Sequence, residues 1–200
     1  MMLAAILLAG ACALHGPAAD TTSSSWTVLP SSRFEVTSEA GGFLATLSHE
    51  HRIVAGAFRA ELDYRPDDPS ADRIDVVVPV DSLEVRTVDA SPAQLHAIRE
   101  HMLKDVLRAA HHPEIRFASR SVEPVAGGVR VTGSLTLEDS TRTVTVVTRL
   151  ESRGDTLIAR GTLPFRQTDF GIEPYSFGFG AVKVKDKLRL DFEVRAVPRE

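Results

Sequence analysis

Segments in which apolar and polar residues alternate recur along most of this sequence, and they restrict its fold more than any other feature. In residues 187–194, Lys-Leu-Arg-Leu-Asp-Phe-Glu-Val, every second side chain is apolar and the side chains between them are charged. Because successive side chains of a β-strand point to opposite faces, this order predicts a strand with one buried face. Alternation of this kind also spaces the following apolar sets: Ile74, Val76, Val78 and Val80; Val129, Val131, Leu135 and Leu137; Val144, Val146 and Leu150; Val54, Phe58, Leu62 and Tyr64; Phe34 and Val36; Ile115 and Phe117.

Turn-forming residues separate these segments by gaps of hairpin length. They are found at residues 40–42, 66–69, 126–128 and 154–155, where Gly, Pro and Asp concentrate. Strands that follow one another through such short connections pair antiparallel, because parallel pairing needs a long crossover. The sequence therefore predicts an antiparallel sheet of about eight strands.

One segment departs from the alternation and predicts a helix. Ser91 can cap it, Pro92 takes the first helical position, and the helix should run to about Ala109. One face of this helix is apolar, with Leu95, Ile98, Met102, Leu103 and Val106. A single amphipathic helix beside about eight strands predicts a mainly β fold, an antiparallel barrel with the helix across one mouth or flank. Such a barrel either fills its interior with side chains or holds one slender ligand.

The N-terminal residues 1–14 form an apolar run that is too short for a membrane-spanning helix, which needs about 20 residues. Its length fits the apolar core of a secretory signal, although no positively charged residue precedes it. Ala9-Gly10-Ala11-Cys12 resembles a lipoprotein signal, in which Cys12 would be lipidated after cleavage. Ala11-Cys12-Ala13 alternatively fits the rule for ordinary signal cleavage, and a buried N-terminal segment is a third interpretation.

Two regions follow from this interpretation: a signal peptide or lipoprotein signal over residues 1–19 and one β-barrel domain over residues 26–197. We therefore expect a periplasmic or otherwise exported protein, anchored to a membrane if Cys12 is lipidated. Cys12 is the one cysteine of the sequence, which excludes an internal disulfide.

Charge and motifs exclude several functions. The 200 residues carry a formal net charge of -4 with no basic stripe, which argues against nucleic acid as a partner. The sequence contains neither a P-loop nor a dinucleotide-binding fingerprint. Ser48 and His49 are neighbours that would point to opposite faces of a strand, so they cannot form a catalytic dyad. We therefore predict that the protein is not an enzyme and has neither catalytic residues nor a cofactor.

His49 and His51 would share one face of a strand, which leaves three interpretations open. They could bind Zn, Cu or Ni with a third ligand, which would make the protein a periplasmic metal- or haem-linked protein. They could instead bond a ligand's headgroup at a barrel mouth, or they could be rim histidines without a ligand. The candidates for a third metal ligand are His96, His101, His111, His112 and Asp169.

Several blocks in order resemble the YceI-like, polyisoprenoid-binding family, and the resemblance extends from Trp26 to about Val194. The blocks are Trp26-Thr27-Val28 with Ser32-Arg33-Phe34-Glu35-Val36; Ala55-Gly56-Ala57-Phe58; Val78-Pro79-Val80-Asp81-Ser82-Leu83; His112-Pro113-Glu114-Ile115-Arg116-Phe117-Ala118-Ser119; Val131-Thr132-Gly133-Ser134-Leu135-Thr136-Leu137; and Phe165-Arg166-Gln167-Thr168-Asp169-Phe170-Gly171-Ile172. In the last block we expect an ion pair between Arg166 and Asp169 that orders the turn. The family's H-G-x-F block is replaced here, since His49-Glu50-His51 precedes Ala55-Gly56-Ala57-Phe58, which indicates a less typical branch.

The resemblance implies a lipocalin-like barrel with a long apolar tunnel for an isoprenoid lipid, either a polyprenyl chain or a quinone-like molecule. The protein would then sequester or carry this lipid in the bacterial envelope, and because family members are often dimeric, a homodimer is one form that it could take. We expect the tunnel to be lined by Phe34, Phe58, Phe117, Leu135, Phe165 and Phe192. We expect the headgroup at a rim formed by His49, His51, Gln167 and Asp169.

Overall fold

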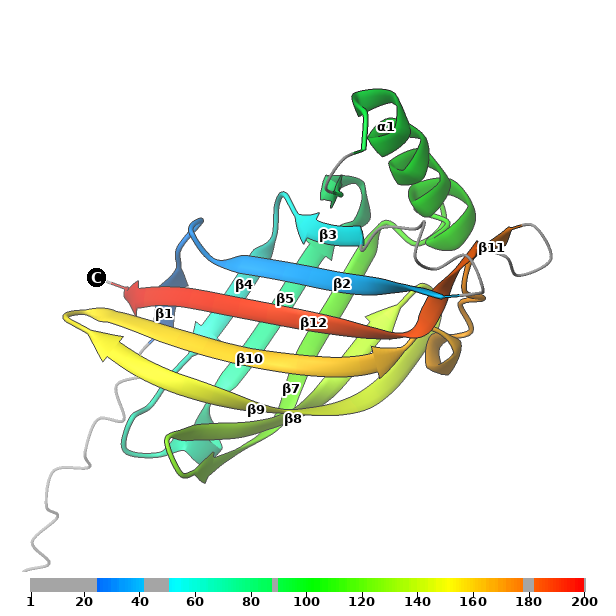
Figure 1. Cartoon of the computed structure of the whole chain (residues 1–200). Helices are drawn as coiled ribbons and strands as arrows, with labels where there is room; N and C mark the ends of the chain where they lie inside the picture. The colour runs from blue at the N-terminus through cyan, green and yellow to red at the C-terminus, as the bar shows by residue number, and fades with distance from the viewer. Residues whose placement is uncertain (1–24, 42–50, 88–89, 178–181, 200) are drawn as a thin grey trace, which may run out of the picture.

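The computed structural model describes residues 25–41, 51–87, 90–177 and 182–199 (Figure 1). Its strands are β1 Ser25–Val28, β2 Arg33–Gly41, β3 His51–Ala55, β4 Arg59–Asp63, β5 Arg73–Pro79, β6 Leu83–Arg86, β7 Glu114–Val125, β8 Gly128–Leu137, β9 Ser140–Arg153, β10 Thr156–Arg166, β11 Ser176–Phe177 and β12 Val182–Pro198. Between them lie the helix α1 Pro92–His101, the π-helical turn η4 Met102–Val106, and the short 3₁₀ turns η2 Pro69–Ala71, η3 Val80–Ser82 and η5 Thr168–Phe170.

The sheet closes on itself to form a barrel. Its pairs follow the order β1-β4-β5-β7-β8-β9-β10-β12, and an additional pairing of β1 with β12 completes the ring. All of these pairings are antiparallel, with Trp26 opposite Pro198 at the closure. Beyond the ring, β2 pairs with β12, β3 pairs with β2, and β6 pairs with β3. The short strand β11 pairs with β12 as well. The predicted antiparallel barrel of eight strands is therefore confirmed.

A bend between β3 and β4 corrects one sequence-based assignment. The Gly56 amide donates to the Ser82 carbonyl at 2.9 Å, and a Cβ on Gly56 would stand 2.7 Å from that oxygen. The close approach requires glycine, and the strand changes direction here. Ile53 and Ala55 face the barrel interior before the bend, and Leu62 faces it afterwards. Val54 was predicted to share a face with Leu62, which is wrong because the bend shifts the alternation by one residue.

The predicted helix is present and begins as expected. The Ser91 side chain accepts from the Gln94 amide and the Gln94 side chain accepts from the Ser91 amide, which completes a capping box ahead of Pro92. The regular α-helix ends at His101 and η4 continues it to Val106, short of the expected end at Ala109. Leu95, Ile98, Met102 and Leu103 pack in a cluster with Val78, Val80, Leu83 and Val85, which confirms the apolar face of the helix.

The helix lies over one end of the barrel (Figure 1). None of the helices in the described residues is long and apolar enough to cross a membrane.

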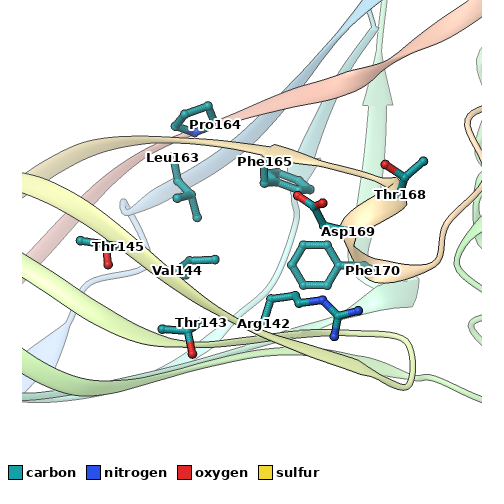
Figure 2. A pocket seen from close by; sticks show the side chains of 10 residues that line it. All are labelled: Arg142, Thr143, Val144, Thr145, Leu163, Pro164, Phe165, Thr168, Asp169 and Phe170. Atoms are coloured by element: carbon teal, nitrogen blue, oxygen red, sulfur yellow. The ribbon is translucent and has the colours of Figure 1, made fainter.

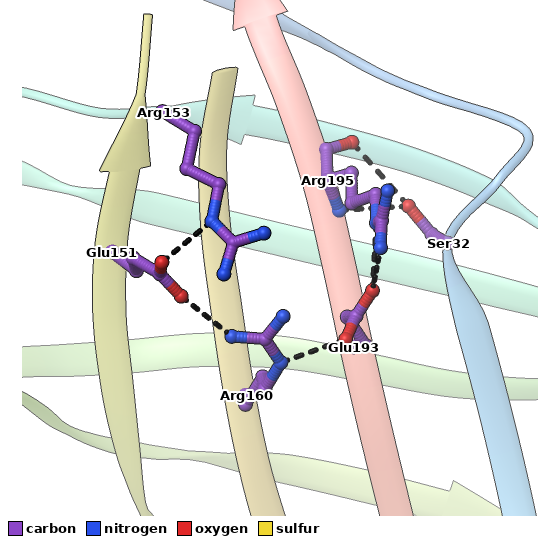
Figure 3. Close-up of polar contacts among 6 residues, drawn as sticks. All are labelled: Ser32, Glu151, Arg153, Arg160, Glu193 and Arg195. Carbon is purple, nitrogen blue, oxygen red and sulfur yellow. Dashed lines mark hydrogen bonds and ion pairs between the residues drawn. The ribbon is translucent and has the colours of Figure 1, made fainter.

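Charged side chains cross the outer face of three neighbouring strands (Figure 3). Arg160 on β10 donates to Glu151 on β9 at 2.9 Å and to Glu193 on β12 at 2.7 Å. Arg153 and Arg195 extend the row at its two ends. These hydrogen bonds lower the pKa of both glutamates and keep their carboxyls ionised. The charges thus lie on the outside of a wall whose inner face is apolar.

Candidate lipid-binding site

The barrel encloses a cavity of about 280 Å³ that is almost wholly apolar. Its wall takes residues from both halves of the barrel and from η4, including Val76, Val131, Leu190 and Val106. Among the described residues that border it, only Glu61, Tyr64, Asp72, Thr148 and Gln167 belong to polar types. A cavity of this composition offers few hydrogen bonds to water and much contact area to a hydrocarbon chain.

The cavity wall includes most of the aromatic residues expected from the sequence. Phe34, Phe117, Phe165 and Phe192 border it, and Leu135 does so as well. They lie on β2, β7, β10, β12 and β8, so alternation along five different strands brings them to one interior. Their contact with a ligand stays a prediction.

Phe58 is the exception and requires a correction. It lies in the bend between β3 and β4 and is not among the residues that border the cavity. Its ring packs edge-on against Phe34 with 5.2 Å between ring centroids, and it contributes to the cluster beneath the helix. The bend at Gly56 moves this side chain out of the cavity wall.

A buried carboxyl group in the wall was not expected from the sequence. Asp72 is 3% exposed, precedes β5, and accepts a hydrogen bond from the Arg65 amide at 2.7 Å. Burial raises the pKa of Asp72 to about 6, against the opposing effects of the Arg65 and Arg73 charges. The pKa of the neighbouring Tyr64 is raised as well, by burial and by the Asp72 charge. In the sequence Asp72 is one of several acids in a turn, and nothing marks it as buried.

Gln167 borders the cavity where β10 ends. It is 7% exposed, and its side-chain nitrogen donates to the Lys185 carbonyl at 3.0 Å. The backbone carbonyl oxygen of Gln167 accepts hydrogen bonds from the amides of Phe170 and Ile172, and these bonds stabilise the turn η5. The side-chain nitrogen and the backbone carbonyl of this predicted rim residue are therefore engaged within the protein.

The ion pair predicted between Arg166 and Asp169 is replaced by a different one. Arg166 lies 3.7 Å from Asp186, whose carboxylate also accepts from the amide and hydroxyl of Thr168 at 2.9 and 2.8 Å. These bonds, with Arg166 nearby, lower the pKa of Asp186. Asp169 is exposed on η5 and does not border the cavity, whereas Gln167 is buried and does. The two residues predicted to share a rim therefore lie in different surroundings.

The histidines that could bind a metal are spread over the described part of the chain. His51 begins β3 and its Nδ1 lies 2.7 Å from the Thr87 hydroxyl, whereas His49 falls outside the described residues. His96 pairs with Glu100, and His101 pairs with Asp105 and contacts the Tyr175 ring. The rings of His111 and His112 lie near one another. Within the described residues, no three His, Cys, Asp or Glu side chains gather as a metal site would require.

A second hollow lies on the outside of the barrel, between β9 and β10, and Figure 2 shows the side chains around it. Its volume is about 590 Å³. Val144 on β9 and Leu163, Pro164 and Phe165 on β10 form two of its sides, and η5 contributes Phe170. Polar side chains complete the lining: Arg142, Thr143, Thr145, Thr168 and Asp169. We call this hollow the β9–β10 cleft.

An antiparallel barrel of eight strands, capped by one helix and enclosing an apolar cavity, defines the class of small β-barrel binding proteins. A family model described as YceI-like domain matches residues 21–196 of the sequence, so the chain belongs to the YceI-like family.

Individual relatives agree with this assignment. The proteins called Protein YceI from Salmonella arizonae and Salmonella newport are 32% identical to the chain over 89 residues. This aligned segment is 44% of the chain and 42% of each relative, so the chain matches less than half the length of these curated relatives.

Solved structures share the fold. BcnA from Burkholderia cenocepacia superimposes with a TM-score of 0.70 at 20% identity, covering 86% of this chain and 100% of BcnA. A YCEI protein from Campylobacter jejuni gives a TM-score of 0.60 at 18% identity, over 74% of this chain and 85% of that protein. A polyisoprenoid binding domain from Saccharophagus degradans gives 0.60 at 9% identity, over 88% of this chain and 99% of that domain.

Proposed function

We propose that this protein binds one isoprenoid-type lipid, a polyprenyl chain or a quinone-like molecule, in the cavity of its barrel. The observation that carries the proposal is the cavity itself, with Phe34, Phe117, Leu135, Phe165 and Phe192 in a wall that is otherwise mostly aliphatic. Membership of the YceI-like family and the polyisoprenoid binding domain among the structural neighbours support the same class of ligand.

The apolar lining of the cavity argues for an apolar ligand and against water. A volume of about 280 Å³ has room for roughly nine water molecules at about 30 Å³ each. Each ordered water needs about two to four polar partners, which an interior with so few polar side chains cannot supply. An isoprenoid chain needs no such partners, and burying it is favourable by about 25 cal/mol per Å² of apolar surface, less the cost of ordering the chain.

The binding is passive sequestration or carriage of the lipid, with no chemical step. The barrel shields the apolar chain from water, and the polar headgroup stays at a rim. The signal-like residues 1–19 support a location in the bacterial envelope. The protein would be either free in the periplasm or anchored to a membrane through a lipidated Cys12. The mass of the mature protein, compared with that of a Cys12→Ser variant, tests both export and lipidation.

Native mass spectrometry of the mature protein, purified without detergent and then extracted with organic solvent, tests the proposed ligand. We expect a bound mass that matches a prenyl lipid or a quinone. Recovery of unliganded protein that also fails to bind retinol, a fluorescent isoprenoid alcohol, would contradict the proposal. A metal adduct that disappears in the His49→Ala and His51→Ala variants would instead favour the metal-linked alternative.

A further inference from the structure

The wall of the barrel is not hydrogen-bonded along its whole length. β9 and β10 pair from Arg153 opposite Thr156 to Thr148 opposite Gly161, and their pairing ends there. Each strand continues on its other side, because β9 pairs with β8 as far as Ser140 and β10 pairs with β12 as far as Arg166. Both strands are therefore intact where they separate, and the β9–β10 cleft lies between their unpaired parts.

Two sequence features lie where these strands separate. Pro164 lies in the unpaired part of β10, and proline has no backbone N–H to donate to a neighbouring strand. The side chain of Phe192 lies across Gly161 at the last paired position, where a Cβ would meet its ring at 2.5 Å. Gly161 is thus the last paired residue of β10 on this side, and Pro164 lies three residues beyond it.

The cleft and the cavity share part of their walls. Leu163 and Phe165 border both hollows, so the cleft and the cavity lie on either side of these two side chains. Leu163 is buried and Phe165 is half-buried. Phe165 packs edge-on against Phe170, which is fully buried in the turn η5, with 6.0 Å between ring centroids. Phe165 is thus packed against the buried ring of Phe170 and also borders the cleft.

The cleft combines an apolar base with a polar edge. Val144, Leu163, Phe165 and Phe170 supply the apolar surface, and Thr143, Thr145 and Asp169 lie around it exposed. Val147, just beyond this edge on β9, is 54% exposed, which is unusual for a large aliphatic side chain. An apolar passage with a polar rim suits an amphiphilic molecule, whose chain can enter while its headgroup stays hydrated.

We propose that the β9–β10 cleft is a lateral entrance, through which the isoprenoid chain enters and leaves the cavity as Phe165 swings aside. The inference rests on the proposed function, because it assumes that an isoprenoid chain occupies the cavity. The inference adds the route by which the chain reaches the cavity. This route passes through the side of the barrel wall and not past η4 at the end of the barrel.

Stopped-flow fluorescence with retinol tests the entrance, since retinol is an isoprenoid alcohol whose emission rises on leaving water. A Thr145→Trp substitution adds a large side chain at the edge of the cleft and should slow retinol association by at least about threefold. The matched control is Thr132→Trp, because the hydroxyls of Thr132 and Thr145 bond to one another at 3.0 Å on the outer face. Both variants lose this bond, but only Thr145 borders the cleft, so Thr132→Trp should associate like the wild type.

Removing a large side chain from the cleft should have the opposite effect and open the entrance. Phe165→Ala should increase both association and dissociation rate constants by at least about threefold. Phe117→Ala removes the same ring from a part of the cavity wall away from the cleft, so it should increase the dissociation rate constant only. Thermal melting of each variant confirms that it is folded before kinetics are compared.

The outcomes separate this proposal from the proposed function. If the wild type binds no retinol and carries no extractable prenyl lipid, the proposed function fails. If the wild type binds retinol but Thr145→Trp and Phe165→Ala leave association unchanged, the lateral entrance is wrong. Faster association in Val106→Ala, at the η4 end of the cavity, together with unchanged association in the cleft variants, would place the entrance beneath the helix.

Discussion

The ring of Phe192 on β12 lies across the backbone of Gly161 on β10, directly opposite it in the sheet. A Cβ at residue 161 would stand 2.5 Å from Cζ of Phe192 and 3.2 Å from Cγ2 of Val146. The ring therefore uses space that only a glycine leaves open, and this contact lies at the position where β9 and β10 separate.

Replacing Gly161 with alanine should therefore destabilise the barrel. We expect Gly161→Ala to lower the free energy of unfolding by about 2 kcal/mol, because an added methyl in a packed wall forces neighbouring side chains to shift. Chemical denaturation measures the change. Combining Gly161→Ala with Phe192→Leu should cost less than the sum of the two single substitutions, since the shorter side chain relieves the collision. Strictly additive costs would show that the two residues do not collide.

The buried carboxyl of Asp72 should make stability depend on pH. Because its pKa is raised to about 6, the folded protein binds this proton more tightly than the unfolded chain does. Its contribution is therefore fully present below the unfolded pKa and is lost as pH rises through about 6. We expect Asp72→Asn to be more stable relative to the wild type at about pH 7.5 than at about pH 4, as measured by thermal melting. The other charged groups near Asp72 are Arg65, Asp68 and Arg73.

A constant difference between Asp72→Asn and the wild type at all pH values would contradict a raised pKa. Asparagine can still accept from the Arg65 amide, so the substitution changes the charge and keeps this bond. An Arg73→Gln variant serves as the control, because it removes a charge that lowers the pKa and should make the loss of stability with rising pH larger.

Filling the cavity should abolish lipid binding without unfolding the protein. Ala159 on β10 borders the cavity, and an Ala159→Phe side chain would occupy space that the isoprenoid chain needs. We expect retinol affinity to fall by about tenfold or more, as measured by fluorescence titration. The control is Ala126→Phe, in the exposed turn between β7 and β8, which should bind retinol like the wild type. Equal affinities for the two variants would place retinol outside the cavity.

The capping box of α1 should contribute measurably to stability. Ser91→Ala removes the hydroxyl that accepts from the Gln94 amide, and we expect a loss of about 1 kcal/mol in the free energy of unfolding. Ser91→Asp keeps an acceptor at this position and should retain most of the stability. If both variants lose the same amount, the cap is not the cause. The measurement is denaturant-induced unfolding monitored by circular dichroism.

Local patterns in the sequence predicted the strands and the helix because both depend on nearby residues. The start of the helix at Ser91-Pro92 is one example. The alternation in 187–194 is another, and its apolar residues Leu188, Leu190, Phe192 and Val194 all border the cavity. The bend at Gly56 was missed because it depends on contact with the carbonyl of Ser82, which lies in the turn η3, 26 residues further along the chain. This one contact accounts for the misplacement of both Val54 and Phe58.

The polar part of the site could not be predicted, because the pairing partners are distant in the sequence. Arg166 pairs with Asp186 and not with Asp169, since the chain returns along β12 and brings Asp186 beside the turn. Asp72 is buried at the wall of the cavity, a position that depends on the folded barrel and that the residues around it in the sequence do not indicate. The β9–β10 cleft likewise follows from where two strands stop pairing, which the alternation along each strand does not indicate.

The closure of the ring by β1 and β12 determines when the barrel can form. Trp26 on β1 is opposite Pro198 on β12, so β1 cannot pair on both of its edges until β12 is present. While the ribosome still holds the segment of β12, the partial sheet has open edges at β1, β2 and β10, and its apolar face has no cover. The closed apolar interior therefore forms only after β12 has been synthesised, in the step that pairs β1 with β12.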